Sequence, residues 1–213
     1  MHLNPLSYNL PKIYPITDPH LSGISHASQV ERLVHGGARI VQLREKLASP
    51  REFYEAAFPA VAIAKRHRVP VIINDRVDIA IALHADGVHL GQGDIPPRSA
   101  RKIMGENAII GFSTHTAEQV REALTLPIDY IAFGPIFPTR TKDRPDPVVS
   151  LAGLSEARSI TGSIPLVAIG GIDVTNALSV LNAGATSVAM IGAIVAEPTA
   201  ISKNLRRLNS LLQ

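Results

Sequence analysis

Short apolar runs alternate with longer segments of helical period along this chain, and Gly, Pro, Asn or Asp marks most of the junctions. The apolar runs are rich in Val, Ile and Leu, as strands buried on both faces are. We expect strands at residues 12–17, 39–43, 70–74, 87–90, 108–113, 130–134, 165–170 and 187–192. Helices are expected between them, among others at residues 28–37, 50–68, 116–126 and 174–185, with Pro59 as a possible kink in the second.

Eight strands, each followed by a helix, indicate an α/β protein with a parallel sheet covered by helices. The count favours a closed (β/α)₈ TIM barrel, formed as a single domain by residues 1–213. A doubly wound open sheet is the alternative architecture. It is less favoured because no G-x-G-x-x-G sequence opens the first helix.

Composition narrows the class of partner. The 213 residues are 46% hydrophobic and 18% charged, which is ordinary for a globular protein, and the net charge of +3 is not gathered into a basic run. With 4% aromatic residues and no Trp, the chain has little material for stacking nucleic-acid bases, so we expect small phosphorylated ligands and no nucleic acid.

The Cys content and the lengths of the apolar runs indicate the cellular compartment of the protein. The absence of Cys excludes disulfides, a thiol nucleophile and cysteine-ligated zinc, and it fits a reducing cytoplasm. The first residues lack the pattern of a secretory signal, and no apolar run approaches membrane-spanning length. We therefore expect a cytoplasmic protein without a membrane partner. Whether it forms a homo-oligomer stays open.

A row of polar side chains closes the second expected strand. In the sequence VQLREK, Gln42, Arg44 and Lys46 are spaced by two, so an extended chain points them to one side and Glu45 to the other. An Arg fork beside a Lys charge suits a phosphate or diphosphate. A solvated strand end is the alternative explanation.

Two acids follow the third and fourth expected strands. Asp75 and Asp94 lie where a carboxylate is costly unless a cation or a donor meets it, although Asp after a strand also commonly caps a helix or forms a turn. Because these strands are neighbours in a barrel, the two carboxylates are expected to converge on one Mg²⁺, which accepts one or two carboxylates together with phosphate oxygens. His89, on the strand between them, is expected to be a packed, hydrogen-bonded histidine.

A second anion site is suggested by the sequences AIGGI and MIGAI at the last two strands. Gly170, Gly171 and Gly192 would let backbone N–H groups approach a phosphate, as loops after strands seven and eight of this fold often do. Tight strand-to-helix turns are the alternative explanation for each glycine alone. The Pro-rich segment 134–150 is too long for an ordinary connection and predicts a functional or mobile loop.

The chain resembles the thiamine phosphate synthase family nearly from end to end. The resemblance rests on the ordered sequences YPITD, VQLREK, INDRVDIAIALHADGVHLGQGD, GFSTHT, DYIAFGPIFPTRTK, VAIGGI and VAMIGAI. It implies a Mg²⁺-dependent transferase. The family joins 4-amino-2-methyl-5-hydroxymethylpyrimidine diphosphate to 4-methyl-5-(2-hydroxyethyl)thiazole phosphate, or its carboxylated form, and releases diphosphate. Its chemistry is dissociative: diphosphate leaves, a pyrimidine-stabilised carbocation forms, and the thiazole nitrogen captures it.

The resemblance also implies three groups of site residues. Those implied for the pyrimidine diphosphate are Gln42, Leu43, Arg44, Glu45, Lys46, Asn74, Ser113 and Lys142, with Arg44, Lys46 and Lys142 as the catalytic cations. Those implied for Mg²⁺ are Asp75 and Asp94. Those implied for the thiazole phosphate are Thr139, Arg140, Thr141, Gly171, Ile191 and Gly192. The chain departs from the family pattern at Gly192, where Ser is usual, and at Gly93, where an acid is frequent.

Two other functions compete with this one. A related thiazole tautomerase shares the barrel but binds one substrate without Mg²⁺, and the intact Asn74, Asp75 and Asp94 argue against it. A non-catalytic sensor of phosphorylated ligands is the second alternative, although a sensor has little need for a metal site beside a cation row.

Overall fold

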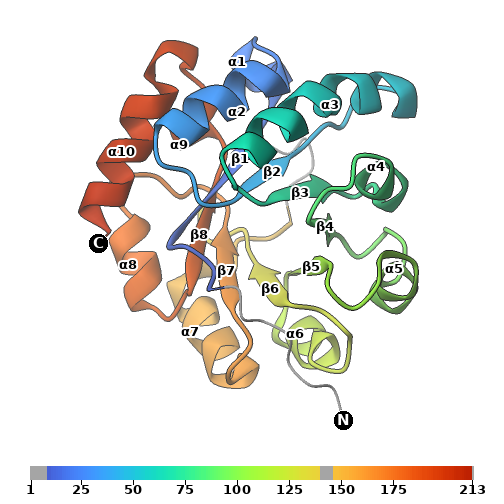
Figure 1. Ribbon diagram of the computed structural model, residues 1–213. Helices are drawn as coiled ribbons and strands as arrows, with labels where there is room; N and C mark the ends of the chain where they lie inside the picture. The colour runs from blue at the N-terminus through green and yellow to red at the C-terminus, as the bar shows by residue number, and fades with distance from the viewer. Residues whose placement is uncertain (1–8, 140–145, 213) are drawn as a thin grey trace.

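The structure is a computed structural model that describes residues 9–139 and 146–212. Parallel strands close into a barrel in chain order from β1 to β8 (Figure 1). The strands are β1 Ile13–Thr17, β2 Val41–Leu43, β3 Val71–Asn74, β4 Gly87–Leu90, β5 Ile109–Thr114, β6 Tyr130–Phe133, β7 Leu166–Ile169 and β8 Ser187–Met190. The expected (β/α)₈ barrel is confirmed, and the open doubly wound sheet is wrong.

Helices form a ring outside the strands, as Figure 1 shows. They are α1 Pro19–Ser22, α2 His26–His35, α3 Pro50–Arg66, α4 Val77–Ala82, α5 Pro97–Met104, α6 Ala117–Ala123, α7 Ser150–Thr161, α8 Ala177–Asn182, α9 Gly192–Val195 and α10 Ile201–Leu211, with a 3₁₀ turn at Pro198–Ala200 before α10. Helix α3 does not end at Pro59, which lies on its exposed side, where water can satisfy the carbonyl that proline leaves unpaired. Within the described residues, no helix is long and apolar enough to cross a membrane.

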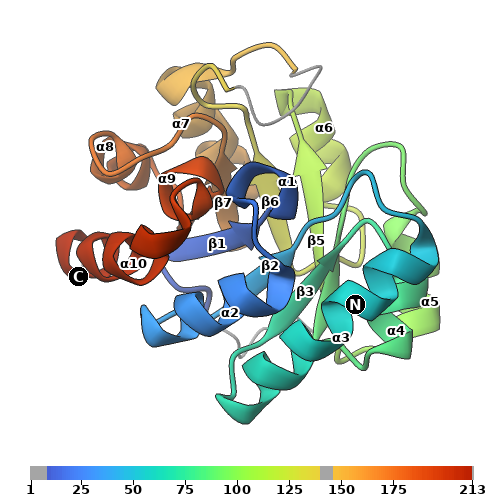
Figure 2. The same ribbon diagram turned by 90° about the horizontal axis from the view of Figure 1, so that it is seen from above.

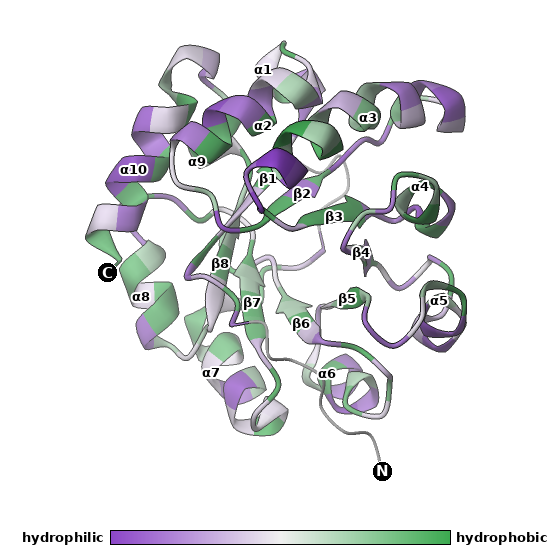
Figure 3. Ribbon diagram, viewed as in Figure 1, coloured by the Kyte–Doolittle hydropathy of each residue, from purple (hydrophilic) through white to green (hydrophobic). Residues whose placement is uncertain are grey.

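Two apolar shells hold the barrel together. One lies between strands and helices and includes Leu43, Phe53 and Leu90. The other fills the inside of the barrel and includes Ile40 and Ile72. Figure 3 shows hydrophobic strands at the centre and polar residues on the outer helices. The strands are therefore apolar on both faces, which explains their near-continuous Val and Ile runs.

A chain of hydrogen bonds crosses the barrel interior. The Tyr14 and Tyr130 hydroxyls are 3.0 Å apart, and the Tyr130 hydroxyl lies 2.9 Å from Nδ1 of His89. The His89 and Tyr130 rings stack, with centroids 5.5 Å apart. Gly111 on β5 makes this possible, because a Cβ there would lie 2.0 Å from Cζ of Tyr130. His89 is thus a packed, hydrogen-bonded histidine, as the sequence predicted.

A buried ion pair lies at the other end of the strands. Asp129 comes just before β6, and its Oδ2 accepts hydrogen bonds of 2.7 Å from both Nη2 of Arg101 and the backbone of Ile110. Arg101, on α5, also donates to backbone carbonyls, among them that of Ala108. Both side chains are buried, so this pair ties α5 to β5 and β6 far from the strand ends that carry the candidate site.

Candidate active site

A cavity of about 810 Å³ opens at the carboxyl ends of the strands. Its size is within the range of small-molecule sites, and the carboxyl ends are where barrels of this kind carry their chemistry. The site residues predicted from the sequence that line it are Gln42, Arg44, Lys46, Asn74, Asp75, Asp94, Ser113, Thr139, Gly171, Ile191 and Gly192. The closed barrel brings these residues, 150 positions apart in the chain at the extremes, to one cavity.

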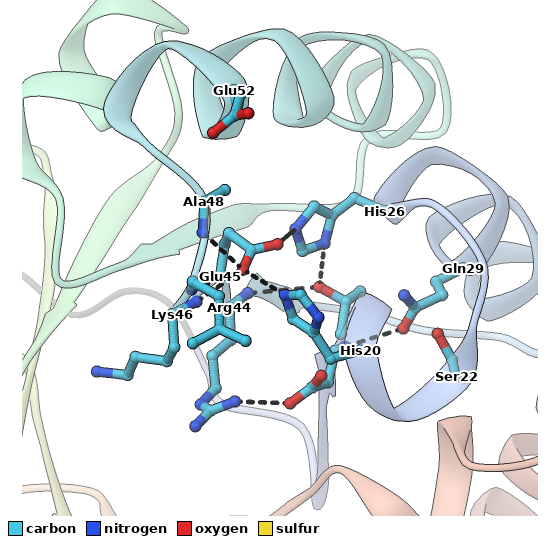
Figure 4. A network of polar contacts seen from close by, with 12 residues as sticks. His20, Ser22, His26, Gln29, Arg44, Glu45, Lys46, Ala48 and Glu52 are labelled. Carbon is cyan, nitrogen blue, oxygen red and sulfur yellow. Dashed lines mark hydrogen bonds and ion pairs between the residues drawn. The ribbon is translucent and has the colours of Figure 1, made fainter.

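Strand β2 and the loop after it present the cation row. Gln42, Arg44 and Lys46 line the cavity, and Leu43 is buried in the outer shell instead. Glu45 points away from Arg44 and Lys46 toward His20 and His26, as Figure 4 shows. The predicted alternation is confirmed. Leu43 and Glu45 were predicted as diphosphate ligands, and their side chains do not line the cavity, so any such contact falls to their backbone.

The carboxylate of Glu45 holds the loop together. Its Oε1 accepts hydrogen bonds from the backbone N–H groups of Lys46 at 2.9 Å and Leu47 at 3.0 Å, and it lies 3.0 Å from Nε2 of His20. Burial alone would raise the pKa of Glu45, but the bonds from Leu47 and His20 outweigh it and lower that pKa. Glu45 therefore stays ionised and fixes the backbone that carries Arg44 and Lys46.

Each of the two cations in the row has an acidic partner. Nη1 of Arg44 donates to Oδ2 of Asp18 at 2.6 Å, and the Lys46 ammonium donates to Oδ2 of Asp75. The side chain of Arg44 is 17% exposed, whereas that of Lys46 is 49% exposed. Arg44 is therefore held against the wall of the cavity, whereas about half of the Lys46 side chain is open to solvent.

Asp75 and Asp94 face each other at the ends of β3 and β4. Burial and then the nearby Asp75 carboxylate raise the pKa of Asp94, while a 2.6 Å hydrogen bond from the Gly91 N–H opposes that rise. Asp75 has a left-handed backbone with φ of 62°, which is uncommon outside glycine and marks a constrained site. Two carboxylates that repel each other are a pair that a shared cation would stabilise.

The side chains at this position are compatible with a Mg²⁺ ion that also binds oxygens of a phosphorylated substrate. Within residues 9–139 and 146–212 the structure holds no cluster of three or more His, Cys, Asp or Glu side chains arranged for a metal ion. Two neighbouring carboxylates such as Asp75 and Asp94 are nevertheless compatible with an ion whose other ligands are water and phosphate oxygens.

Asn74 and Ser113 lie deeper in the cavity. The Nδ2 atom of Asn74 is buried and has no hydrogen-bond partner within the described part of the chain, and Asn74 is one of the residues that line the cavity. Oγ of Ser113 lies 2.9 Å from Nε2 of His89. Burial lowers the pKa of His89 to about 4, so the ring is neutral at physiological pH and one of its nitrogens accepts.

The ends of β7 and β8 form the opposite wall. The first hydrogen bonds of α9 run from Ile194 and Val195 to the Ile191 carbonyl, so the helix does not use the N–H groups of Gly192 and Ala193. Ala193 joins the predicted Ile191 and Gly192 in lining the cavity. This wall offers backbone donors to an anion.

Gly170 and Gly171 have a further role that the sequence did not indicate. A Cβ on Gly170 would lie 2.4 Å from Cβ of Pro135, and a Cβ on Gly171 would lie 2.6 Å from the Pro138 carbonyl oxygen. Both residues also have positive φ. Glycine is thus required here because the segment after β6 packs against the end of β7.

That segment brings Thr139 to the cavity. Its start is fixed by a 3.0 Å hydrogen bond from the Phe137 N–H to the Gly170 carbonyl. The other site residues predicted in it, Arg140, Thr141 and Lys142, lie outside the described residues.

Several residues that line the cavity were not predicted from the sequence. Among them are Tyr14, Ile16, His115 and Tyr130. Nδ1 of His115 lies 2.6 Å from the Gly134 carbonyl oxygen. Asp18 itself directly follows β1 in the sequence YPITD, so the strand-end argument applied to Asp75 would have found it. The two tyrosines gave no such signal, because they stand inside apolar strands.

Comparison with known proteins decides the family. The family model described as thiamine monophosphate synthase matches residues 13–194. The chain belongs to this family. A thiamine-phosphate synthase from Chloroflexus aurantiacus is 43% identical over 205 residues, which cover 95% of this chain and 94% of the relative. One from Halalkalibacterium halodurans is 50% identical over 167 residues, 78% of each chain.

A solved structure supports the assignment of the chain to the thiamine monophosphate synthase family. The thiamine phosphate pyrophosphorylase from Pyrococcus furiosus superposes with a TM-score of 0.84 at 36% identity and 94% coverage of both chains. The resemblance read from the sequence motifs is therefore confirmed.

Proposed function

We propose that this chain is a thiamine phosphate synthase, a transferase that joins the pyrimidine diphosphate to the thiazole phosphate and releases diphosphate. The observation that supports this most is the composition of one cavity. Cationic side chains and paired carboxylates follow β2 to β4, and backbone donors follow β7 and β8. One cavity can therefore hold two phosphorylated molecules at the same time, with their reacting atoms between the two walls.

The diphosphate belongs with the cation row. Arg44 offers a planar fork of donors and Lys46 a mobile charge, and both are suited to an oxyanion that gains charge as it leaves. Asn74 and Ser113 add neutral donors beside them. Gln42 is buried, and its Nε2 donates to the Tyr14 hydroxyl at 3.3 Å. We assign it to the pyrimidine end of the same substrate.

Asp75 and Asp94 are the proposed ligands of Mg²⁺. When bound, the ion would neutralise charge on the diphosphate and so make it a better leaving group. In the structure the Lys46 ammonium contacts Asp75. If Asp75 held the ion, Lys46 would be free to donate to substrate oxygens instead.

The thiazole phosphate belongs with Gly171, Ile191 and Gly192, and with Thr139 on the segment after β6. Departure of diphosphate leaves a pyrimidine-stabilised carbocation, which the thiazole nitrogen captures to form the new C–N bond. The protein needs no nucleophile for this path and has no Cys to supply one. Its own residues orient the two substrates and stabilise the departing charge.

An assay of diphosphate release tests the proposal. Both substrates together with Mg²⁺ should release diphosphate and form thiamine phosphate, and chelation of divalent ions should stop the reaction. Conversion of a thiazole phosphate isomer without Mg²⁺ would instead indicate a tautomerase. Binding of both substrates without turnover would indicate a sensor.

A further inference from the structure

Helix α1 lies between the two walls of the cavity. It follows β1, which pairs with β2 on one side and β8 on the other. Figure 2 shows α1 next to α9. Asp18, just before α1, contacts Arg44, and Leu21 within α1 lies beside Gly192, where an added Cβ would be 3.8 Å from its Cδ2.

Asp18 is held in position by contacts other than the one with Arg44. Its Oδ1 accepts a 3.0 Å hydrogen bond from the Leu21 N–H and so caps α1. Its backbone N–H donates at 3.0 Å to Oε1 of Gln29, a side chain with no exposed surface. The side chain of Asp18 is itself only 8% exposed. The carboxylate therefore has one well-defined position and a single oxygen, Oδ2, left for Arg44.

The contact leaves most of the Arg44 guanidinium available. Asp18 engages Nη1, and within the described residues Nε and Nη2 of Arg44 have no hydrogen-bond partner. The backbone below is fixed as well, because the Arg44 N–H donates to Oγ1 of Thr17 and Glu45 holds the following loop (Figure 4). A guanidinium is a rigid planar fork, so fixing one nitrogen fixes the direction of the other donors.

We propose that Asp18 is the positioning residue for Arg44, holding its free donor edge toward the diphosphate of the pyrimidine substrate. This inference rests on the proposed function for the identity of that substrate. By charge alone, a carboxylate beside an anion site weakens anion binding, so loss of Asp18 would tighten it. If Asp18 instead orients Arg44, loss of Asp18 would weaken anion binding, since a misplaced donor can reduce binding or rate by about a hundredfold. The sign of the effect therefore separates positioning from competition.

Asp18→Asn is the decisive variant. Asn keeps an oxygen that caps α1 but removes the charge that holds Nη1. The matched control is Asp78→Asn, which removes the same charge from an exposed Asp–Arg pair with Arg76. Titration of inorganic diphosphate in the presence of Mg²⁺ should show affinity weakened about ten- to a hundredfold in Asp18→Asn and unchanged in Asp78→Asn. Affinity for thiazole phosphate should stay the same in both.

The Arg44→Ala background completes the test. If Asp18 acts through Arg44, adding Asp18→Asn to Arg44→Ala should not weaken diphosphate binding further. An equal loss of diphosphate affinity in the wild-type and Arg44→Ala backgrounds would overturn the proposal. Unchanged or tighter diphosphate binding in Asp18→Asn, or an equal loss for both ligands, would also overturn it. Asp18→Ser, which can still cap α1, replaces Asn if that variant does not fold. Wild-type protein that binds diphosphate without forming thiamine phosphate would refute the proposed function and leave this comparison valid.

Discussion

At the scale of single residues, Asp75 and Asp94 carry the metal hypothesis. We expect Asp75→Asn and Asp94→Asn each to lower turnover by about a hundredfold or more while leaving the thermal unfolding temperature close to that of the wild type. The fold should persist because removing one charge relieves the repulsion that raises the pKa of Asp94, and an amide oxygen can still accept from Gly91. Wild-type rates that survive exhaustive chelation would contradict the metal role.

Gly192 is the residue where the chain departs from the family pattern. Its φ is not positive and an added Cβ would make only ordinary contact with Leu21, so Gly192→Ser should fold normally. The new hydroxyl adds at most one hydrogen bond to a charged group, about 1.5–3 kcal/mol. Because the proposal assigns the phosphate contacts mainly to backbone N–H groups, we expect the Michaelis constant for thiazole phosphate to fall only a few-fold. A change confined to the pyrimidine substrate would show that the two anion sites are assigned the wrong way round.

What the sequence reveals at this scale depends on local geometry. The period of two placed Gln42, Arg44 and Lys46 on one side correctly, since alternation is a property of the extended backbone alone. The partners of these side chains are not local. Asp18 reaches Arg44 across 26 positions of chain, and this contact follows from the pairing of β1 with β2.

At the scale of elements, α2 carries a buried histidine that links stability to pH. Burial lowers the pKa of His26 to about 4, against the opposing charges of Glu45 and Asp18. Its Nδ1 lies 2.8 Å from Oγ1 of Thr17. The folded state thus prefers the neutral ring, so the stabilisation is complete above the ordinary pKa of 6.5 and is lost as pH falls from 6.5 toward 4.

Denaturant unfolding at two pH values checks this. The free energy of unfolding should fall by about 2 kcal/mol per such histidine between pH 7 and pH 5. His89 shifts in the same direction, so His26→Gln should reduce the loss by roughly half and not remove it. An identical loss in the wild type and in His26→Gln would refute the role of His26.

Element types were predictable and their ends were less so. The strand at residues 87–90 was predicted to the residue, whereas β2 begins at Val41 and not at residue 39. Strand ends depend on which backbone groups find partners in neighbouring strands, and a single segment does not encode that. The short helix α1 was not expected, because its four residues are too few to show a helical period.

At the scale of the whole molecule, the barrel places a buried ion pair that stabilises the fold at the opposite end of the strands from the candidate active site. Asp129 and Arg101 lie at the amino ends of the strands, and removing one partner of a buried ion pair leaves an uncompensated charge. We expect Asp129→Asn to lower the free energy of unfolding by about 3 kcal/mol or more with kcat/KM unchanged at temperatures where the variant is folded. A loss of kcat/KM under those conditions would contradict this separation.

The closed barrel itself could be predicted because eight apolar runs with helices between them allow few other architectures. The hydrogen-bonded interior of Tyr14, Tyr130 and His89 could not, since it depends on the space that Gly111 leaves across the sheet. Such contacts arise only when all the strands are in register.

One cavity is proposed to hold two separate anion sites. Titration of thiazole phosphate into protein saturated with inorganic diphosphate and Mg²⁺ tests it directly. We expect thiazole phosphate to bind once per chain with its affinity kept or improved, because the sites lie on walls formed by different strands. Competition between the two ligands, with thiazole phosphate binding lost as the diphosphate concentration rises, would show that the cavity has one anion site and not two.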